Sequence, residues 1–325
     1  MYSSEPLYRF VDHYLAFLHE SHPTDATLDG VHGYDDMLED LSRAAIENHV
    51  RALAGFSRRL DQISSDSLTA VERVEHPVVA ANIRARLYEL EEVRSWERNP
   101  LYYGHILAST LVGQTLFAYA PAVERARRVL SKLRQLPRFV HSARENVKDP
   151  PGIYVKVGLE TLRGVLKFVE SDLPRAFADV DDLHLLGDLA DASTEAVDAM
   201  KSYIAYLEED LAPRARASFR LGRQRLEEKL RLEEGIGLSA ERLLAIAGRE
   251  LAATQDEFRR VAGRVNSGDP IEAWRDAKRR HPEVGHLVRD AQGQIDDLVR
   301  FIQRHDIVSI PGNEQVVVAP TPDFY

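Results

Sequence analysis

The stretch that decides the fold class runs from Val284 to Ile302 and reads VGHLVRDAQGQIDDLVRFI. Its apolar residues recur at intervals of three and four, which is the spacing of one face of an α-helix. Charged and polar residues fill most of the positions between them. The pattern predicts a long amphipathic helix that buries Val284, Leu287, Val288, Ala291, Ile295, Leu298, Val299 and Ile302.

The same periodicity runs through most of the preceding chain. It predicts helices over residues 8–18, 42–63, 70–96, 101–119 and 155–170, and a further helix that begins at Ser239. The segment 101–119 is the most apolar and is expected to be a buried helix and turn. Pro77 should kink the third helix or mark its start. The helix after Ser239 is expected to bury Leu244, Ala247, Leu251, Phe258, Val261 and Val265.

The last twenty residues have a different pattern. Two β-branched runs, residues 307–310 and 316–319, flank the turn-forming sequence Pro311-Gly312-Asn313, which predicts a β-hairpin followed by an extended tail. The predicted fold is therefore all-α, with mostly long antiparallel helices and a small C-terminal hairpin. We expect a helical lobe over residues 1–304, and we expect residues 305–325 to pair with a second polypeptide or a symmetry mate, because a two-stranded edge is unstable alone.

Composition excludes several classes of protein. The chain has 325 residues, no cysteine and a formal net charge of −10. Disulfides and thiol catalysis are therefore excluded. The net negative charge argues against a protein that binds nucleic acid or anionic membranes. No run approaches the roughly 18 apolar residues of a membrane-spanning helix. Because no signal peptide is recognised, we expect a cytoplasmic location.

Two runs of opposite charge follow one another in the sequence. Residues 179–198 contain seven acidic side chains and no Lys or Arg, whereas residues 214–231 contain seven basic ones. On a continuous helix, Arg216, Arg220 and Arg223 would share one stripe. Solvated or mutually paired faces are the first interpretation. A phosphate or carboxylate site is the second, and a nucleic-acid module using the stripe is the third.

A search for catalytic motifs finds none that is complete. The zinc-protease string His-Glu-x-x-His, the nucleophile elbow and the phosphate-binding loop are all absent. His19 and His22 are three residues apart, but two ligands do not make a zinc site. His281 and His286 are a weaker pair. We therefore expect no catalytic residue and no metal ligand in this chain.

Four groups of residues carry a resemblance to a known family. The first runs from Pro23 to Ser42 and contains Pro-Thr-Asp-Ala-Thr and His-Gly-Tyr-Asp-Asp; the second is Trp96 to Tyr102. The third comprises residues 133–137, 143–146 and 150–151, and the fourth residues 306–311, 316–318 and 321–322. In this order and spacing they resemble domain-of-unknown-function family 885, a group of bacterial helical proteins.

The resemblance implies a function for a larger protein. The family pattern continues past the hairpin into a second half with a His-Glu-x-x-Pro-Gly-His-His helix and a downstream acidic ligand, which implies a zinc peptidase. No residue of this chain matches that motif, so none is carried over as catalytic or metal-binding. What the resemblance implies here is one wall of a peptide-binding cleft, with zinc held by the other half.

Two hypotheses follow. In the first, the chain is the N-terminal helical lobe of a zinc-metallopeptidase-like protein and is inactive alone. Its partner is then a complementary C-terminal half. Independently of this hypothesis, the edge formed by residues 306–325 could instead bind a second copy of the chain. In the second, it is a stand-alone, non-catalytic helical protein that binds a peptide or a protein. Seven residues are candidates to face a ligand or cleft: His32, Tyr34, Asp35, Asp36, Arg216, Arg220 and Arg223.

The candidates His32 to Asp36 lie in a loop, residues 23–42, that we expect to be ordered. Gly30 and Gly33 suit turns with positive φ, and Tyr34 and Leu38 can anchor the loop to helices. Asp35, Asp36 and Asp40 could cap helix N-termini or face a cleft, and capping is the commoner role of aspartate in such loops.

Overall fold

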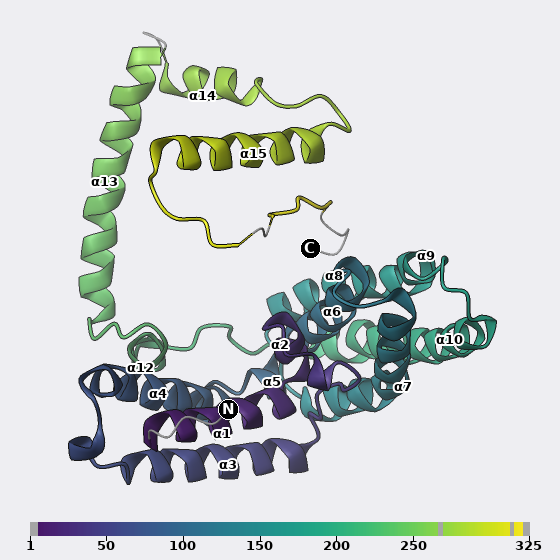
Figure 1. Ribbon diagram of the computed structural model, residues 1–325. Helices are drawn as coiled ribbons and strands as arrows, with labels where there is room; N and C mark the ends of the chain where they lie inside the picture. Colours follow the sequence, from purple (N-terminus) through teal and green to yellow (C-terminus); the bar gives the residue numbers. More distant parts are fainter. Residues whose placement is uncertain (1–5, 266–268, 313–314, 321–325) are drawn as a thin grey trace. The chain divides into compact units, whose positions relative to one another are not determined.

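The computed structural model describes residues 6–265, 269–312 and 315–320. Every regular element within these ranges is helical (Figure 1), so the predicted all-α class is confirmed. The chain divides into two compact units, Met1–Leu238 and Ser239–Asp323. None of the described helices combines the length and apolar character needed to cross a lipid bilayer.

The first unit contains twelve α-helices in its described part. They are α1 (Pro6–Ser21), α2 (Pro23–Leu28), α3 (Arg43–Asp61), α4 (Ala70–Tyr88), α5 (Ser95–Arg98), α6 (Pro100–Leu116), α7 (Ala122–Asn146), α8 (Gly152–Lys167), α9 (Leu173–Ala176), α10 (Leu183–Tyr206), α11 (Ala212–Arg214) and α12 (Arg223–Glu233). Pro77 lies inside α4, which continues through it into a π-helical turn, η3 (Glu89–Val93).

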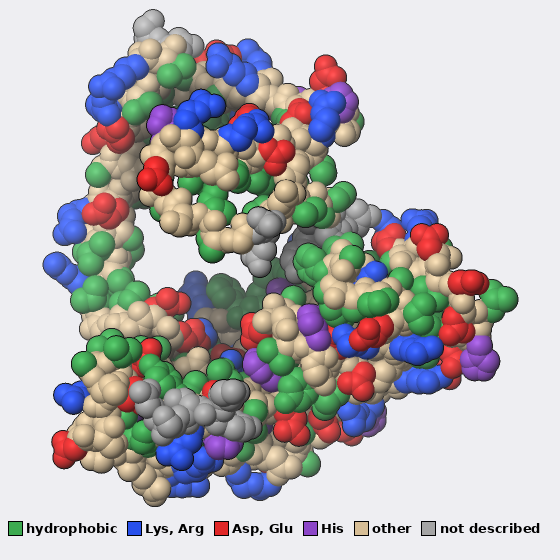
Figure 2. Space-filling view, in the orientation of Figure 1, with side chains coloured by type: hydrophobic (Ala, Val, Ile, Leu, Met, Phe, Trp, Pro, Cys, Tyr) green, Lys and Arg blue, Asp and Glu red, His purple; other side chains and the backbone are tan. Residues whose placement is uncertain are grey.

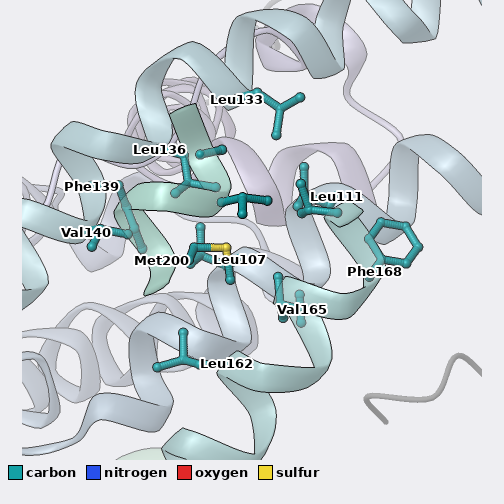
Figure 3. Close-up of a cluster of buried hydrophobic side chains, with 14 of the residues drawn as sticks. Leu107, Leu111, Leu133, Leu136, Phe139, Val140, Leu162, Val165, Phe168 and Met200 are labelled. Atoms are coloured by element: carbon teal, nitrogen blue, oxygen red, sulfur yellow. The ribbon is translucent and has the colours of Figure 1, made fainter. Parts of the chain in front are cut away.

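The main hydrophobic core lies between α6, α7, α8 and α10 (Figure 3). It is built from the inward faces of these helices, and the side chains labelled in the figure are Leu107, Leu111, Leu133, Leu136, Phe139, Val140, Leu162, Val165, Phe168 and Met200. The apolar segment that begins at Leu101 is largely buried, as its composition predicts, although Leu116 and Phe117 at its end are exposed.

Helices α6 and α8 approach closely at Gly158. A Cβ atom at this position would lie 3.0 Å from both the backbone nitrogen of Leu101 and the Cβ of Pro100. Such a distance is tighter than most Cβ contacts, so any residue larger than glycine would require α6 to shift by a few tenths of an ångström. The small residue therefore fixes how the start of α6 sits on α8.

A second, smaller core joins α1, α3 and α4, which lie beside one another in Figure 1. Phe10 and Tyr14 on α1 contact Phe56 on α3, with ring centroids 5.7 and 5.3 Å apart. Ile83 of α4 is fully buried against them. This cluster holds α1 in place, and α1 also forms one wall of a cavity described below.

The prediction of a C-terminal hairpin is wrong. Residues 307–312 and 315–320 form no strand. Instead, the side-chain amide of Gln292 donates to the carbonyl of Val316 at 3.0 Å and accepts from the N–H of Val318 at 2.9 Å. β-branched residues favour strands only where neighbouring strands or a packed face complete the sheet, and the described residues supply neither. Asn313 of the predicted turn, and the tail from Thr321, lie outside the described residues.

The second unit contains α13 (Ala240–Val265), α14 (Pro270–Lys278) and α15 (Leu287–His305). The two long helices form where the periodicity predicts them, but the prediction that their apolar faces are buried is wrong. Leu244, Leu251 and Val265 on α13 are 59–73% exposed, and Leu287 on α15 is 65% exposed. Figure 2 shows such hydrophobic side chains open on α13. In the described part of this unit, the only buried apolar side chains are those of Ala262 and Ala273.

The main core gives a direct stability prediction. Leu133 on α7 is fully buried, whereas Leu183 at the start of α10 is 84% exposed. Replacing Leu133 by alanine should lower the free energy of unfolding by about 3 kcal/mol, because it leaves a cavity as well as losing apolar contact. Leu183→Ala is the matched control and should change it by less than about 0.5 kcal/mol. Chemical denaturation measures both, and equal effects would contradict the assigned core.

Candidate functional site

The loop after α2 carries a buried carboxylate. Gly30 adopts φ +79° directly after α2, and the short 3₁₀ turn η1 (His32–Tyr34) follows it. This path delivers Asp35 to the interior, where it is 1% exposed. The Thr27 hydroxyl of α2 donates to its Oδ1 at 2.7 Å. The loop is thus ordered around one acid.

The other partners of Asp35 come from α6, α7 and the segment between them. The Tyr119 hydroxyl donates to Oδ2 at 2.7 Å, and the Arg128 guanidinium forms an ion pair with the same oxygen. The Gln114 amide donates to the Asp35 backbone carbonyl at 2.5 Å. A single carboxylate therefore fastens the loop to the helices of the main core.

His32 completes this arrangement, which we call the Asp35 cluster: Thr27, His32, Asp35, Gln114, Tyr119 and Arg128. The His32 Nδ1 lies 3.1 Å from Asp35 Oδ2. Its ring stacks on that of Tyr119, with centroids 4.0 Å apart and planes inclined by 3°. The Arg128 guanidinium lies 5.7 Å from the Tyr119 ring centroid. Two of the predicted candidates, His32 and Asp35, are thus brought together.

The electrostatics of the Asp35 cluster favour a fixed charge. Burial acts to raise the pKa of Asp35, but hydrogen bonds from Thr27 and Tyr119 and the nearby charges of His32 and Arg128 outweigh it and hold the pKa below its usual value. Burial, together with the bond to Asp35, raises the pKa of Tyr119 to about 12. A carboxylate that stays ionised and has several partners is suited to anchoring the loop, not to transferring protons.

The remaining loop candidates lie apart from this cluster. The side chain of Asp36 is exposed, and its backbone carbonyl accepts bonds from the Ser131 hydroxyl at 2.7 Å and the Gln135 amide at 2.8 Å. Tyr34 is half-buried, with its ring 6.5 Å from that of His19. Neither Asp35 nor Asp36 provides an N-cap bond in the described helices, so the capping role expected for them is wrong.

The predicted arginine stripe does not form. Residues 215–222 are not helical, and Gly222 adopts φ +85° before α12 begins at Arg223. Arg216 and Arg220 therefore lie on an irregular segment and share no helix face with Arg223. Arg223 pairs with Glu227 at 3.1 Å, and Arg225 and Lys229 reach Glu92 and Glu89. The acidic run on α10 pairs with other arginines, including Arg134 with Asp188 at 3.0 Å.

A second polar layer lies next to the Asp35 cluster. The buried Glu39 carboxylate accepts from the Thr24 N–H at 3.0 Å and from its hydroxyl at 2.9 Å, at the N-terminus of α2. Lys132 on α7 is buried, and its Nζ donates to the Thr110 hydroxyl at 2.7 Å. Burial lowers the pKa of Lys132 to about 8, although the charge of Glu39 opposes this. Burial raises the pKa of Glu39.

Two cavities lie on the other side of α2 and share His22 and Asp25. The first, of about 490 Å³, is the α1–α4 cavity, lined by Val11, Tyr14, Leu15, Leu18, His19, His22, Asp25, Leu28, Asp29, Val78, Val79, Asn82 and Arg86. The second, of about 390 Å³, extends from His22 and Asp25 to Glu39, Glu89, Tyr102 and His105. Cavities of this size, with apolar walls and a few polar groups, are typical of small-ligand sites.

His22 sits where the two cavities meet and is neutral near pH 7. Its Nδ1 lies 3.2 Å from the Leu18 carbonyl, and its ring contacts that of His49 at 4.9 Å. Burial, reinforced by the positive charge of Arg86, lowers the pKa of His22 to about 4. Burial likewise lowers the pKa of His49 to about 4. Burial raises the pKa of Asp25, against the opposing effect of Arg86.

Comparison with known proteins now identifies the family. The family model described as "Bacterial protein of unknown function (DUF885)" matches residues 23–325. The chain belongs to this family. No curated protein matches the sequence.

One solved structure has the same fold as this DUF885 chain. It is described as "a putative lipoprotein of unknown function from Shewanella oneidensis" and superposes with a TM-score of 0.72 at 21% sequence identity. The match covers 94% of this chain and 58% of the other. The chain thus spans somewhat more than half the length of that protein.

The DUF885 chain offers no ready metal centre in its described residues. No group of three His, Asp or Glu side chains lies close enough together to hold an ion. His19 and His22 both line the α1–α4 cavity, but the Nε2 of His19 lies 3.4 Å from Asp29 and the Nδ1 of His22 faces a backbone carbonyl.

Sequence reasoning missed several residues that organise this region. Tyr119 and Arg128 lie 84 and 93 positions from Asp35, and no local pattern connects them. Asp25 stands inside the recognised DUF885 signature, and Arg86 inside a predicted helix, but neither has a local neighbour that suggests a site. The one available signal was His22, which was considered only as half of a metal-ligand pair.

The Asp35 cluster predicts a large difference between two adjacent acids. Asp35→Asn should lower the free energy of unfolding by about 2 to 3 kcal/mol, because it removes the charge that faces Arg128 and several bonds. Asp36→Asn, on an exposed side chain, should change it by less than about 0.5 kcal/mol. Because the Asp35 pKa is lowered, its contribution is present above the unfolded value of 3.8 and is lost as the pH falls further. Equal losses in denaturant titrations at pH 7 would contradict the anchoring role.

The two buried histidines predict a separate, milder acid effect. Their pKa values are about 4 when folded and 6.5 when unfolded. The unfolded chain therefore binds more protons, and stability should fall as the pH drops from 6.5 toward 4, by at most about 3 kcal/mol per histidine. His22→Gln and His49→Gln should each flatten the dependence of melting temperature on pH in this window. His184→Gln, at an exposed position, is the control. Identical slopes for all proteins would contradict the assignment.

Proposed function

We propose that this chain is the N-terminal helical lobe of a zinc-metallopeptidase-like protein, in which it forms one wall of a peptide-binding cleft. It supplies no catalytic residue of its own. Zinc, the general base and the activated water belong to a C-terminal half with the His-Glu-x-x-Pro-Gly-His-His helix. The chain alone is then inactive as a peptidase, and the proposal keeps the cytoplasmic location expected from the sequence.

The observation that carries the proposal is the exposed apolar surface of the second unit. Helices α13 and α15 each have one apolar face, yet Leu244, Leu251, Leu287 and Leu298 are 57–73% exposed. Helices of this kind are stable when another surface covers the apolar face. The solved relative contains a further 42% of chain beyond the matched part, which is enough material to supply such a surface. A complementary lobe is therefore the occupant that we propose.

A second candidate is a stand-alone, non-catalytic protein that binds a peptide or another protein. The same exposed faces favour it, because contiguous apolar surface often marks a protein-binding site. In this case a second copy of the chain, or an unrelated protein, would cover α13 and α15. The two candidates differ in whether the partner carries zinc.

Affinity purification from the native cell separates the two candidates. The chain is tagged at its N-terminus, and the purified material is analysed by mass spectrometry and for metal content. The proposal predicts a polypeptide with the His-Glu-x-x-Pro-Gly-His-His string, either continuous with this chain or bound to it, and about one zinc ion per complex. Purification of a homodimer, or of a partner without zinc and without that string, would contradict it.

A further inference from the structure

The α1–α4 cavity contains two opposite charges that lack charged partners. Within the described residues, Arg86 has no carboxylate within ion-pair distance. Its Nε donates to the Asn82 side chain at 3.3 Å, and a further hydrogen bond links it to the Tyr14 side chain. The carboxylate of Asp25 likewise has no hydrogen-bond donor among the described side chains and N–H groups. By contrast, the other acid of the lining, Asp29, already faces His19 at 3.4 Å. The Arg86 guanidinium and the Asp25 carboxylate are therefore available to bind a ligand.

The structure holds these two groups in place. Asn82, which accepts from Arg86, also accepts from the buried Tyr14 hydroxyl at 2.7 Å, so the guanidinium is tied to α1 as well as to α4. Asp25 stands in the first turn of α2, a helix fixed by Glu39 at its N-terminus. The charge of Arg86 influences the titration of both Asp25 and His22. Preformed charges of this kind reduce the cost of ordering a site on binding.

The rest of the lining is apolar and open. Val11, Leu15, Leu18, Leu28, Val78 and Val79 form the walls. Leu15, Leu28 and Val78 are 43%, 57% and 66% exposed, so apolar surface is available to a ligand. His22, which is neutral near pH 7, adds no second positive charge. The cavity thus offers an apolar surface, one cation and one anion.

We infer that the α1–α4 cavity binds an apolar amino acid or short apolar peptide as a zwitterion, with its carboxylate on Arg86, its ammonium on Asp25 and its side chain on the Val and Leu wall. Arg86 is half-buried and Asp25 is exposed, so a ligand with only one charge would forgo one of the two charge-assisted hydrogen bonds that this pair offers. A ligand without an apolar side chain would leave the wall in water. The inference concerns this cavity alone and requires neither zinc nor a second lobe.

Isothermal titration calorimetry of the whole chain tests the inference with four probes. L-Leucine and the dipeptide Leu-Leu carry both charges at different separations, and the tighter binder distinguishes a free amino acid from a peptide. 4-Methylpentanoate lacks the ammonium, and isopentylamine lacks the carboxylate. Each single-charge probe should bind about tenfold or more weakly than the better zwitterion, as expected for the loss of one charge-assisted bond.

Variants assign each charge to its residue. Arg86→Met should weaken zwitterion binding about tenfold while leaving isopentylamine unchanged, and Asp25→Asn should do the same while leaving 4-methylpentanoate unchanged. Arg86→Lys keeps the charge and should retain part of the affinity. Arg84→Met on the same helix and Asp61→Asn on α3 are exposed controls and should bind like the unaltered chain. Melting curves establish that each variant is folded.

Three results would overturn the inference. The first is the absence of measurable binding by all four probes. The second is equal affinity for zwitterions and single-charge probes, which would mean that only the apolar wall is recognised. The third is unchanged zwitterion binding in folded Arg86→Met and Asp25→Asn, which would place the ligand elsewhere on the chain.

Discussion

The packing of α6, α7, α8 and α10 around one apolar core is the constraint on which the first unit depends. These helices bury side chains such as Leu107, Leu133 and Met200 almost completely. Burial of apolar surface is the main favourable contribution to folding. The polar side chains that contact the loop after α2 belong to the same helices. Arg128 and Lys132 project from α7, and Gln114 from α6, so the loop after α2 is ordered only because the core already fixes its partners.

Asp35 links the loop and α2 to the helices of that core. Its carboxylate joins Thr27 of α2 to Tyr119 and Arg128. Since α2 also contributes Asp25 to the α1–α4 cavity, the buried ion pair on one side of the helix sets the position of a charged group on the other. The buried Asp35 ion pair is therefore structural, whereas the groups available to a ligand are those around His22 that form no ion pair.

Local patterns predicted the helices because helical periodicity is a property of neighbouring residues. The residues Ile307–Ile310 and Val316–Ala319 were misread as strands because a strand depends on partners that the sequence does not specify. The arginine stripe did not form because the helix ends at Arg214 and residues 215–222 are irregular, with a positive φ at Gly222. His32 and Asp35 were identified from their place in the family signature, but their partners Tyr119 and Arg128 could not be, because only the tertiary fold brings them close.

The two units differ in how far they bury their apolar faces. The described part of the second unit buries only two alanines, so α13 and α15 have no core of their own comparable to that of α7. This difference in apolar burial underlies the proposal that a further polypeptide covers α13 and α15. It also implies that the two units differ in local stability, since regions with few buried apolar contacts open most readily.

Amide hydrogen exchange of the dilute chain tests this account most directly. Amides of α6, α7 and α10 should exchange orders of magnitude more slowly than those of α13 and α15, because α13 buries only Ala262 and α15 buries no described side chain. Protection of α13 and α15 equal to that of α7 in the monomer would contradict it, because their apolar faces would then already be covered.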